Sequence, residues 1–100
     1  MKSCFKKFKR VWEKEISKIE KDVLDFRGVS ILFDKFQIDC LALQMSMSKH
    51  DFTPEMRLEI RLLESKLIRA LEVARTRYVL QSKVINENSK QNNKYFHKNA

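Results

Sequence analysis

Positive charge is concentrated at the N-terminal end of the chain. Its first ten residues contain no acid and five cations: Lys2, Lys6, Lys7, Lys9 and Arg10. Three aromatic residues are interleaved with them: Phe5, Phe8 and Trp12. Lysine and arginine can neutralise phosphates and release their counterions, which is the chemistry of nucleic-acid binding. The favoured alternative is a solvated helix end with its aromatics in a core, and the pattern also fits a helix lying on anionic lipid, with Cys4 as a candidate acylation site.

A second group of cations lies between residues 54 and 85, where it is mixed with glutamates. Alternating signs are typical of a solvated, salt-bridged helix rather than of a phosphate-binding face. After Glu72, however, no acid occurs before Glu87. A basic end of this kind also suits the dipole of a helix C-terminus. We predict anion or nucleic-acid contact at Lys6, Lys7, Lys9, Arg10, Arg75 and Arg77.

Residue types that catalyse reactions or bind metals are present but do not converge. A single glycine cannot form a phosphate-cradling loop. His50 and Asp51 are neighbours in sequence, which does not make them a catalytic pair. Cys4, Cys40, His50 and His97 lack the close spacing of zinc ligands. We therefore expect no enzymatic activity, no cofactor, no metal and no small-molecule substrate.

The composition favours a few long helices. The 100 residues include one glycine and one proline, so few tight turns are available. Apolar residues make up 43% and charged residues 34%, which allows both a core and a solvated surface. The net charge of +8 favours anionic partners. No apolar run approaches the roughly 20 residues of a membrane span, and the cysteines form no close pair, so we expect a cytoplasmic location.

Two helices are predicted in the first half of the chain. The first, over residues 3–26, has an apolar stripe at steps of three and four: Phe5, Phe8, Trp12, Ile16, Ile19, Val23 and Phe26. Gly28 is expected to end it as a C-cap. The second, over residues 30–48, is apolar around most of its circumference, which indicates a central helix or the centre of a dimer. Two alternatives are a continuous helix through Gly28, giving a hairpin, and a short strand at residues 29–33.

The third helix is predicted to begin at Thr53 and Pro54, because threonine caps helices and proline is tolerated at the first helical position. Its apolar seam runs through Met56, Ile60, Leu63, Leu67, Ala70 and Ala74. Beyond Ala74 the seam turns, and apolar residues extend past the end of the second helix. Uncovered apolar surface of that kind marks an interface. We predict partner contact at Leu67, Leu71, Ala74, Tyr78 and Ile85.

The sequence thus predicts an all-α fold, either a three-helix antiparallel bundle or a long helical hairpin, completed by oligomerisation because a chain of this size has a small core. Residues 1–85 form the domain, and residues 86–100 are predicted to be a polar flexible tail. The expected function is a basic protein–protein interaction module of coiled-coil type, such as an assembly factor, chaperone-like adaptor or inhibitor, acting as a homodimer or heteromer. The alternatives are a helical dimer that binds duplex RNA or DNA by shape and phosphate contacts and association with an anionic membrane surface.

Overall fold

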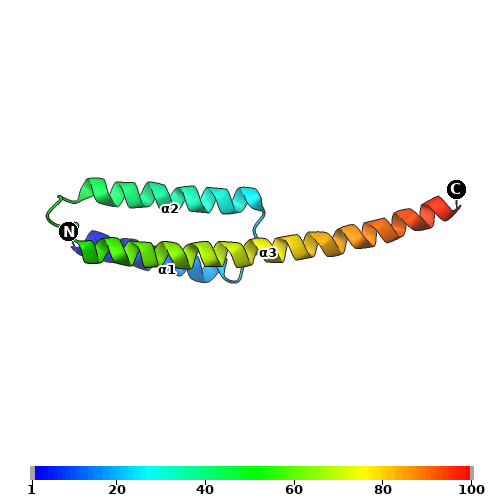
Figure 1. Ribbon diagram of the computed structural model, residues 1–100, viewed down its shortest axis with the longest axis horizontal. Helices are drawn as coiled ribbons and strands as arrows, with labels where there is room; N and C mark the ends of the chain where they lie inside the picture. The colour runs from blue at the N-terminus through cyan, green and yellow to red at the C-terminus, as the bar shows by residue number, and fades with distance from the viewer. Residues whose placement is uncertain (1, 100) are drawn as a thin grey trace.

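Three helices lie along one another in the computed structural model (Figure 1). They are α1 (Lys2–Ile19), α2 (Phe26–Ser46) and α3 (Pro54–Asn99). The structure describes the backbone of residues 2–99 and the side chains of residues 3–83. Consecutive helices run in opposite directions, and no strand occurs within residues 2–99. The predicted all-α three-helix bundle is confirmed, and the break between α1 and α2 rules out the continuous hairpin.

The inner faces of the three helices form one core. Its buried members are Phe5, Phe8, Trp12, Ile16, Ile19, Phe36, Cys40, Leu43, Met47, Ile60, Leu63, Leu67, Ala70, Leu71 and Ala74. The rings of Trp12 and Phe36 meet edge to face, with their centroids 5.0 Å apart. The indole Nε1 of Trp12 donates a hydrogen bond to Asp39 Oδ2 at 3.0 Å. This bond satisfies the one polar atom that the buried indole brings into the core.

The corner between α1 and α2 lies earlier than predicted. α1 ends at Ile19, and α2 already begins at Phe26. Asp25 is the N-cap of α2, because its Oδ1 accepts a hydrogen bond from the backbone N–H of Gly28 at 2.7 Å. Gly28 therefore lies in the first turn of α2, and the prediction that it caps the first helix is wrong. A β-carbon at Gly28 would lie 3.2 Å from both Asp25 Oδ1 and Leu24 Cδ2, which explains why the smallest residue suits this position.

The loop over residues 20–25 is attached to the middle of α3. The backbone N–H of Leu24 donates to the carbonyl oxygen of Ala74 at 3.2 Å. The guanidinium of Arg77 donates to the carbonyl oxygens of Glu20 and Asp22. Val23 and Phe26, predicted to extend the stripe of the first helix, belong instead to this corner, and Phe26 is 69% exposed.

The start of α3 agrees with the sequence. Pro54 is its first residue, and Thr53 Oγ1 accepts a hydrogen bond from the N–H of Met56 at 3.2 Å. The predicted seam is buried from Ile60 to Ala74, with Met56 packed against its edge. The position of the second corner was therefore predictable from its capping residues alone.

α3 continues well beyond the bundle (Figure 1). The chain measures 73 Å along its longest axis and 18 and 17 Å along the others, with a radius of gyration of 20.1 Å. A compact chain of this length would have a radius of gyration of about 13 Å. The helix continues through residues 85 and 86, and side chains from residue 84 onward lie outside the described part. The division into a domain over residues 1–85 and a flexible tail over residues 86–100 stays a prediction.

Candidate functional site

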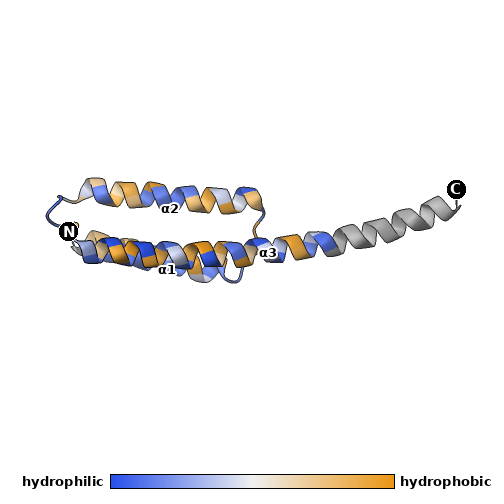
Figure 2. Cartoon of the chain, viewed as in Figure 1, coloured by the Kyte–Doolittle hydropathy of each residue, from blue (hydrophilic) through white to orange (hydrophobic). Residues whose placement is uncertain are grey.

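The outer face of α2 carries a line of exposed apolar side chains, which we call the α2 stripe. Its members are Ile31 (60% exposed), Ile38 (65%), Leu41 (57%) and Met45 (79%). Three of them are seven residues apart, so they align along the helix, and Leu41 falls between the last two in the manner of a coiled-coil seam. The opposite side of the same helix holds the buried Phe36, Cys40 and Leu43. Figure 2 shows hydrophobic residues recurring along the whole of α2.

The charges of α2 cancel, and half of them are directed away from the stripe. The helix contains Arg27 and Lys35 against Asp34 and Asp39, a net charge of zero. The ammonium of Lys35 lies 5.9 Å from the ring centre of Trp12, and Asp39 accepts the indole hydrogen bond. Both side chains thus face α1. Only Arg27 and Asp34, one of each sign, accompany the stripe.

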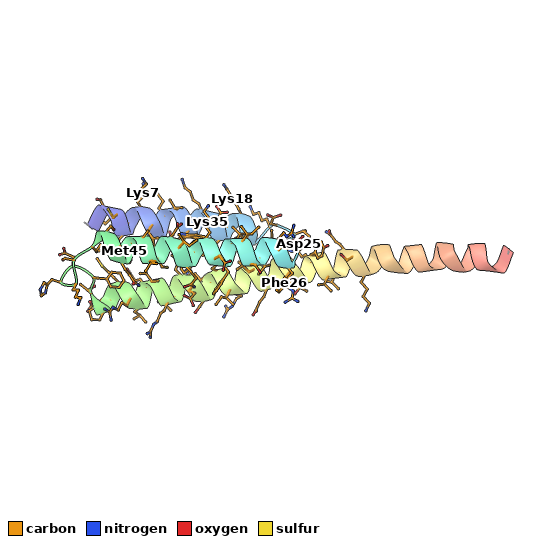
Figure 3. The ribbon with its side chains drawn as sticks, turned by 90° about the horizontal axis from the view of Figure 1, so that it is seen from above. Lys7, Lys18, Asp25, Phe26, Lys35 and Met45 are labelled. Carbon is orange, nitrogen blue, oxygen red and sulfur yellow. The ribbon has the colours of Figure 1, made fainter. Side chains whose placement is uncertain are left out.

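The outer face of α1 is of one sign. Four exposed cations follow one another at steps of three and four, and we call them the α1 basic face: Lys7, Arg10, Lys14 and Lys18. Lys7 and Lys18 both extend away from the other helices (Figure 3). α1 as a whole has seven lysines and arginines against two glutamates, a net charge of +5. Among the side chains of residues 3–83, none of these four cations is in an ion pair.

Several of the residues predicted to contact anions are used inside the chain. Lys9 pairs with Glu59, with its Nζ 3.4 Å from Oε2, and lies 5.0 Å from the ring centre of Phe5. Arg77 holds the loop over residues 20–25. Arg75 lies over the ring of Phe26, with 5.6 Å from its Cζ to the ring centre.

The other three predicted cations, Lys6, Lys7 and Arg10, remain exposed at the start of α1. Lys14 and Lys18 were missed by the sequence analysis, although their steps of four from Arg10 place them on the same helix face.

The residues predicted to contact a partner fall into three situations. Leu67, Leu71 and Ala74 are 0–3% exposed, because α1 and α2 cover this part of α3. A partner would have to open the bundle to reach them. Tyr78 is 41% exposed, and its neighbours Val79 and Leu80 are more exposed still. All three lie in the part of α3 that leaves the bundle. The side chain of Ile85 lies outside the described residues.

The α2 stripe was not singled out from the sequence. The second helix was predicted to be enclosed, whereas in the bundle only its inner face is covered. A three-helix bundle supplies two neighbours to each helix, so a helix that is apolar all round keeps one face uncovered. The recurrence of isoleucine or methionine at residues 31, 38 and 45 was the signal that marked this face.

The two cysteines differ in environment. Cys4 is exposed, and Cys40 is buried in the core. Burial, with smaller contributions from the nearby Glu64 and Asp39, raises the pKa of the Cys40 thiol to about 11. Cys40 is therefore protonated and unreactive near neutral pH. Within residues 3–83, no group of three His, Cys, Asp or Glu side chains is placed to hold a metal ion.

The apolar face of α1 is unavailable to a lipid surface in this arrangement. Phe5, Phe8 and Trp12 are 5%, 8% and 1% exposed, as expected if the aromatics enter the core. A helix lying on a membrane would bury these same residues in lipid. In the described part of the chain, no helix combines the length and hydropathy needed to cross a membrane.

No protein-family model, no curated protein and no solved structure matches this chain.

Proposed function

We propose that this protein is a small helical protein–protein interaction module that binds its partner through the α2 stripe. One observation supports this most directly: four large apolar side chains at coiled-coil spacing, each more than half exposed, on the outside of a folded bundle. Contiguous apolar surface on a small protein usually marks a binding site. The partner expected for such a seam is another amphipathic helix.

The energy available from the stripe is moderate. Fully burying an isoleucine, leucine or methionine side chain contributes about 1.5–3 kcal/mol. With 57–79% of each side chain still exposed, covering all four contributes roughly 5 kcal/mol before the entropic cost of association. Specific binding therefore needs a partner helix of matching spacing.

A matched pair of substitutions tests this function. Leu41 on the stripe and Leu58 on the outside of α3 are 57% and 58% exposed, so replacing either with glutamate introduces the same charge at equal exposure. The tagged chain is used to recover partners from nuclease-treated extracts of its native cells, with bound protein quantified by mass spectrometry. Leu41→Glu should lower recovery of the specific partner at least tenfold, while Leu58→Glu should leave it unchanged. Equal recovery by both variants would contradict the proposal.

Binding to a polyanion is the second candidate function, and the α1 basic face favours it. Lys7 to Lys18 spans about 16 Å of helix, and cations that form no ion pair can each neutralise a phosphate. The measurement is the affinity for duplex RNA and duplex DNA over a range of salt concentrations. An affinity that does not change with salt would eliminate this candidate.

A further inference from the structure

We infer that the α2 stripe binds the stripe of a second copy of this chain, with the two α2 helices antiparallel. The inference rests on the proposed function, because it names the partner of the same surface. Three properties of the molecule support it: the distribution of charge among the helices, the self-complementary spacing of the stripe, and the place of Asp34 within it.

Charge decides where two copies can meet. Each chain carries +8, so two copies repel one another in general. α1 has a net charge of +5, and α3, with ten lysines and arginines against five glutamates, also has +5. α2 has a net charge of zero. Contact through the outer face of α2 is therefore the arrangement that keeps the basic helices of the two copies farthest apart.

The stripe is complementary to itself. Apolar residues that repeat every seven positions form a seam into which the same seam can pack, knobs into holes. The four residues are 57–79% exposed, so the stripe alone supplies less than the roughly 800 Å² per partner of a standard interface. We expect a dimer of moderate affinity, visible as a concentration-dependent equilibrium. Such a dimer would enclose α2 on all sides, as a helix apolar around its circumference requires.

The charged residues beside the stripe favour the antiparallel orientation. In a parallel pair, equivalent residues lie at the same level, so Asp34 would face Asp34 and Arg27 would face Arg27. An antiparallel pair separates both like-charged contacts along the seam. It also places the projecting ends of α3, which begin beyond Arg77 and carry Lys83, at opposite ends of the dimer. Like charges of the two copies therefore lie farther apart, and repel one another less, in the antiparallel arrangement.

Sedimentation velocity of the purified full-length chain over a concentration series tests the dimer. The wild type should shift from monomer to dimer as concentration rises. Leu41→Glu should raise the dissociation constant at least tenfold, and Leu58→Glu should leave it within about twofold, with helicity checked by circular dichroism. Asp34→Leu should lower the dissociation constant at least threefold by completing the apolar seam. A discrete dimer that forms at lower concentration with unchanged helicity distinguishes this tighter binding from aggregation of a misfolded variant.

A nitroxide label at position 27 tests the orientation. The variant Arg27→Cys provides the labelling site, Cys4→Ser removes the other exposed cysteine, and Cys40 is buried and so is not labelled. Pulsed electron–electron double resonance should give a distance of about 30 Å between the nitroxides of the two copies, which is the length of α2. Nitroxides in direct contact would show a parallel pair and overturn the antiparallel assignment.

Two results would overturn the dimer itself. One is a monomer at every concentration. In that case, if Leu41→Glu nevertheless lowers recovery of a partner protein from cell extracts, the proposed function stands and the partner is a different protein. The other is a dimer that tolerates Leu41→Glu but dissociates on Tyr78→Glu, which would place the contact on α3.

Discussion

The outer faces of α1 and α2 differ far more than their inner faces do. Both helices contribute large apolar side chains to one core, where Trp12 of α1 meets Phe36 of α2. Outside, α1 presents Lys7, Arg10, Lys14 and Lys18, whereas α2 presents Ile31, Ile38, Leu41 and Met45. Core packing constrains the inner faces of both helices in the same way. The difference between their outer faces therefore has a cause other than core packing. In a chain of net charge +8, an apolar face without net charge is the feature that packing of the single chain does not explain.

The largest expected effect is a difference in the free energy of unfolding between substitutions on the two sides of α2. Phe36 is 0% exposed and Ile38 is 65% exposed, two positions apart. Phe36→Ala should lower the free energy of unfolding by about 3–5 kcal/mol, because it leaves a cavity in the core. Ile38→Ala should lower it by less than about 0.5 kcal/mol in dilute samples. Urea denaturation at low protein concentration measures both, and equal losses would show that the two sides are not distinct.

Cysteine labelling should separate the surface of α1 from the inner side of α2. With a pKa of about 11 against an ordinary value of 9.0, Cys40 has roughly 100-fold less thiolate near neutral pH, and burial slows its reaction further. At pH 8, iodoacetamide should modify Cys4 more than 100-fold faster than Cys40, as read by peptide mass spectrometry.

The same shift gives the pH dependence of stability. Folding raises the pKa of Cys40, so keeping its thiol protonated contributes to the stability of the folded state. This contribution is complete below about pH 9 and is lost as the pH rises through about 11. A Cys40→Ala variant should lack this component of the alkaline loss. Comparable labelling of both cysteines in the folded protein would contradict the buried position of Cys40.

The α1 basic face should account for most of any polyanion binding. Four phosphate contacts give a salt slope near −3.6 for duplex DNA, so a fourfold increase in salt should weaken binding about 150-fold. Replacing Lys7, Arg10, Lys14 and Lys18 with glutamine should remove most of that slope. The control removes the same charge from α3, where acids are interspersed: Arg57, Arg61, Lys66 and Arg69. Equal losses in the two variants would show that net charge alone determines binding.

The smallest expected effect concerns Arg77, which was predicted to contact an anion. Its guanidinium donates to carbonyl oxygens in the loop between α1 and α2. Arg77→Ala should lower the free energy of unfolding by about 1 kcal/mol and leave the salt slope of polyanion binding unchanged. The neighbouring Arg75→Ala, which loses only a contact with the exposed Phe26, is the control. A reduced slope in Arg77→Ala would return this residue to the anion-binding surface.

Much of the fold was predictable because it depends on local patterns. The seam from Ile60 to Ala74 repeats at helical spacing, and Thr53 with Pro54 marks a helix start by local chemistry. The corner at residues 20–25 was misplaced because Gly28 and Asp25 carry competing signals. Glycine favours a helix end, and aspartate three residues earlier favours a helix start. The N-cap bond to Gly28 and the bond from Leu24 to Ala74 decided between them.

The candidate surfaces were less predictable because exposure depends on neighbouring helices. Leu67 and Ile38 are both apolar residues on amphipathic helices, yet one is 0% and the other 65% exposed. Likewise Lys9 resembles Lys7 in sequence but lies beside Glu59, fifty residues away. Spacing identifies which side chains share a face, and only the packing of the bundle shows which faces remain open.

The attachment of the loop over residues 20–25 to Ala74 and Arg77 also has a mechanical consequence. These two residues lie where α3 leaves the bundle, so the loop is attached at the base of the projecting segment. We expect a force on the projecting segment to act on these hydrogen bonds before it reaches the deeper core. Such a force would therefore reach the junction between α1 and α2 first, at the N-terminal end of the helix that carries the stripe.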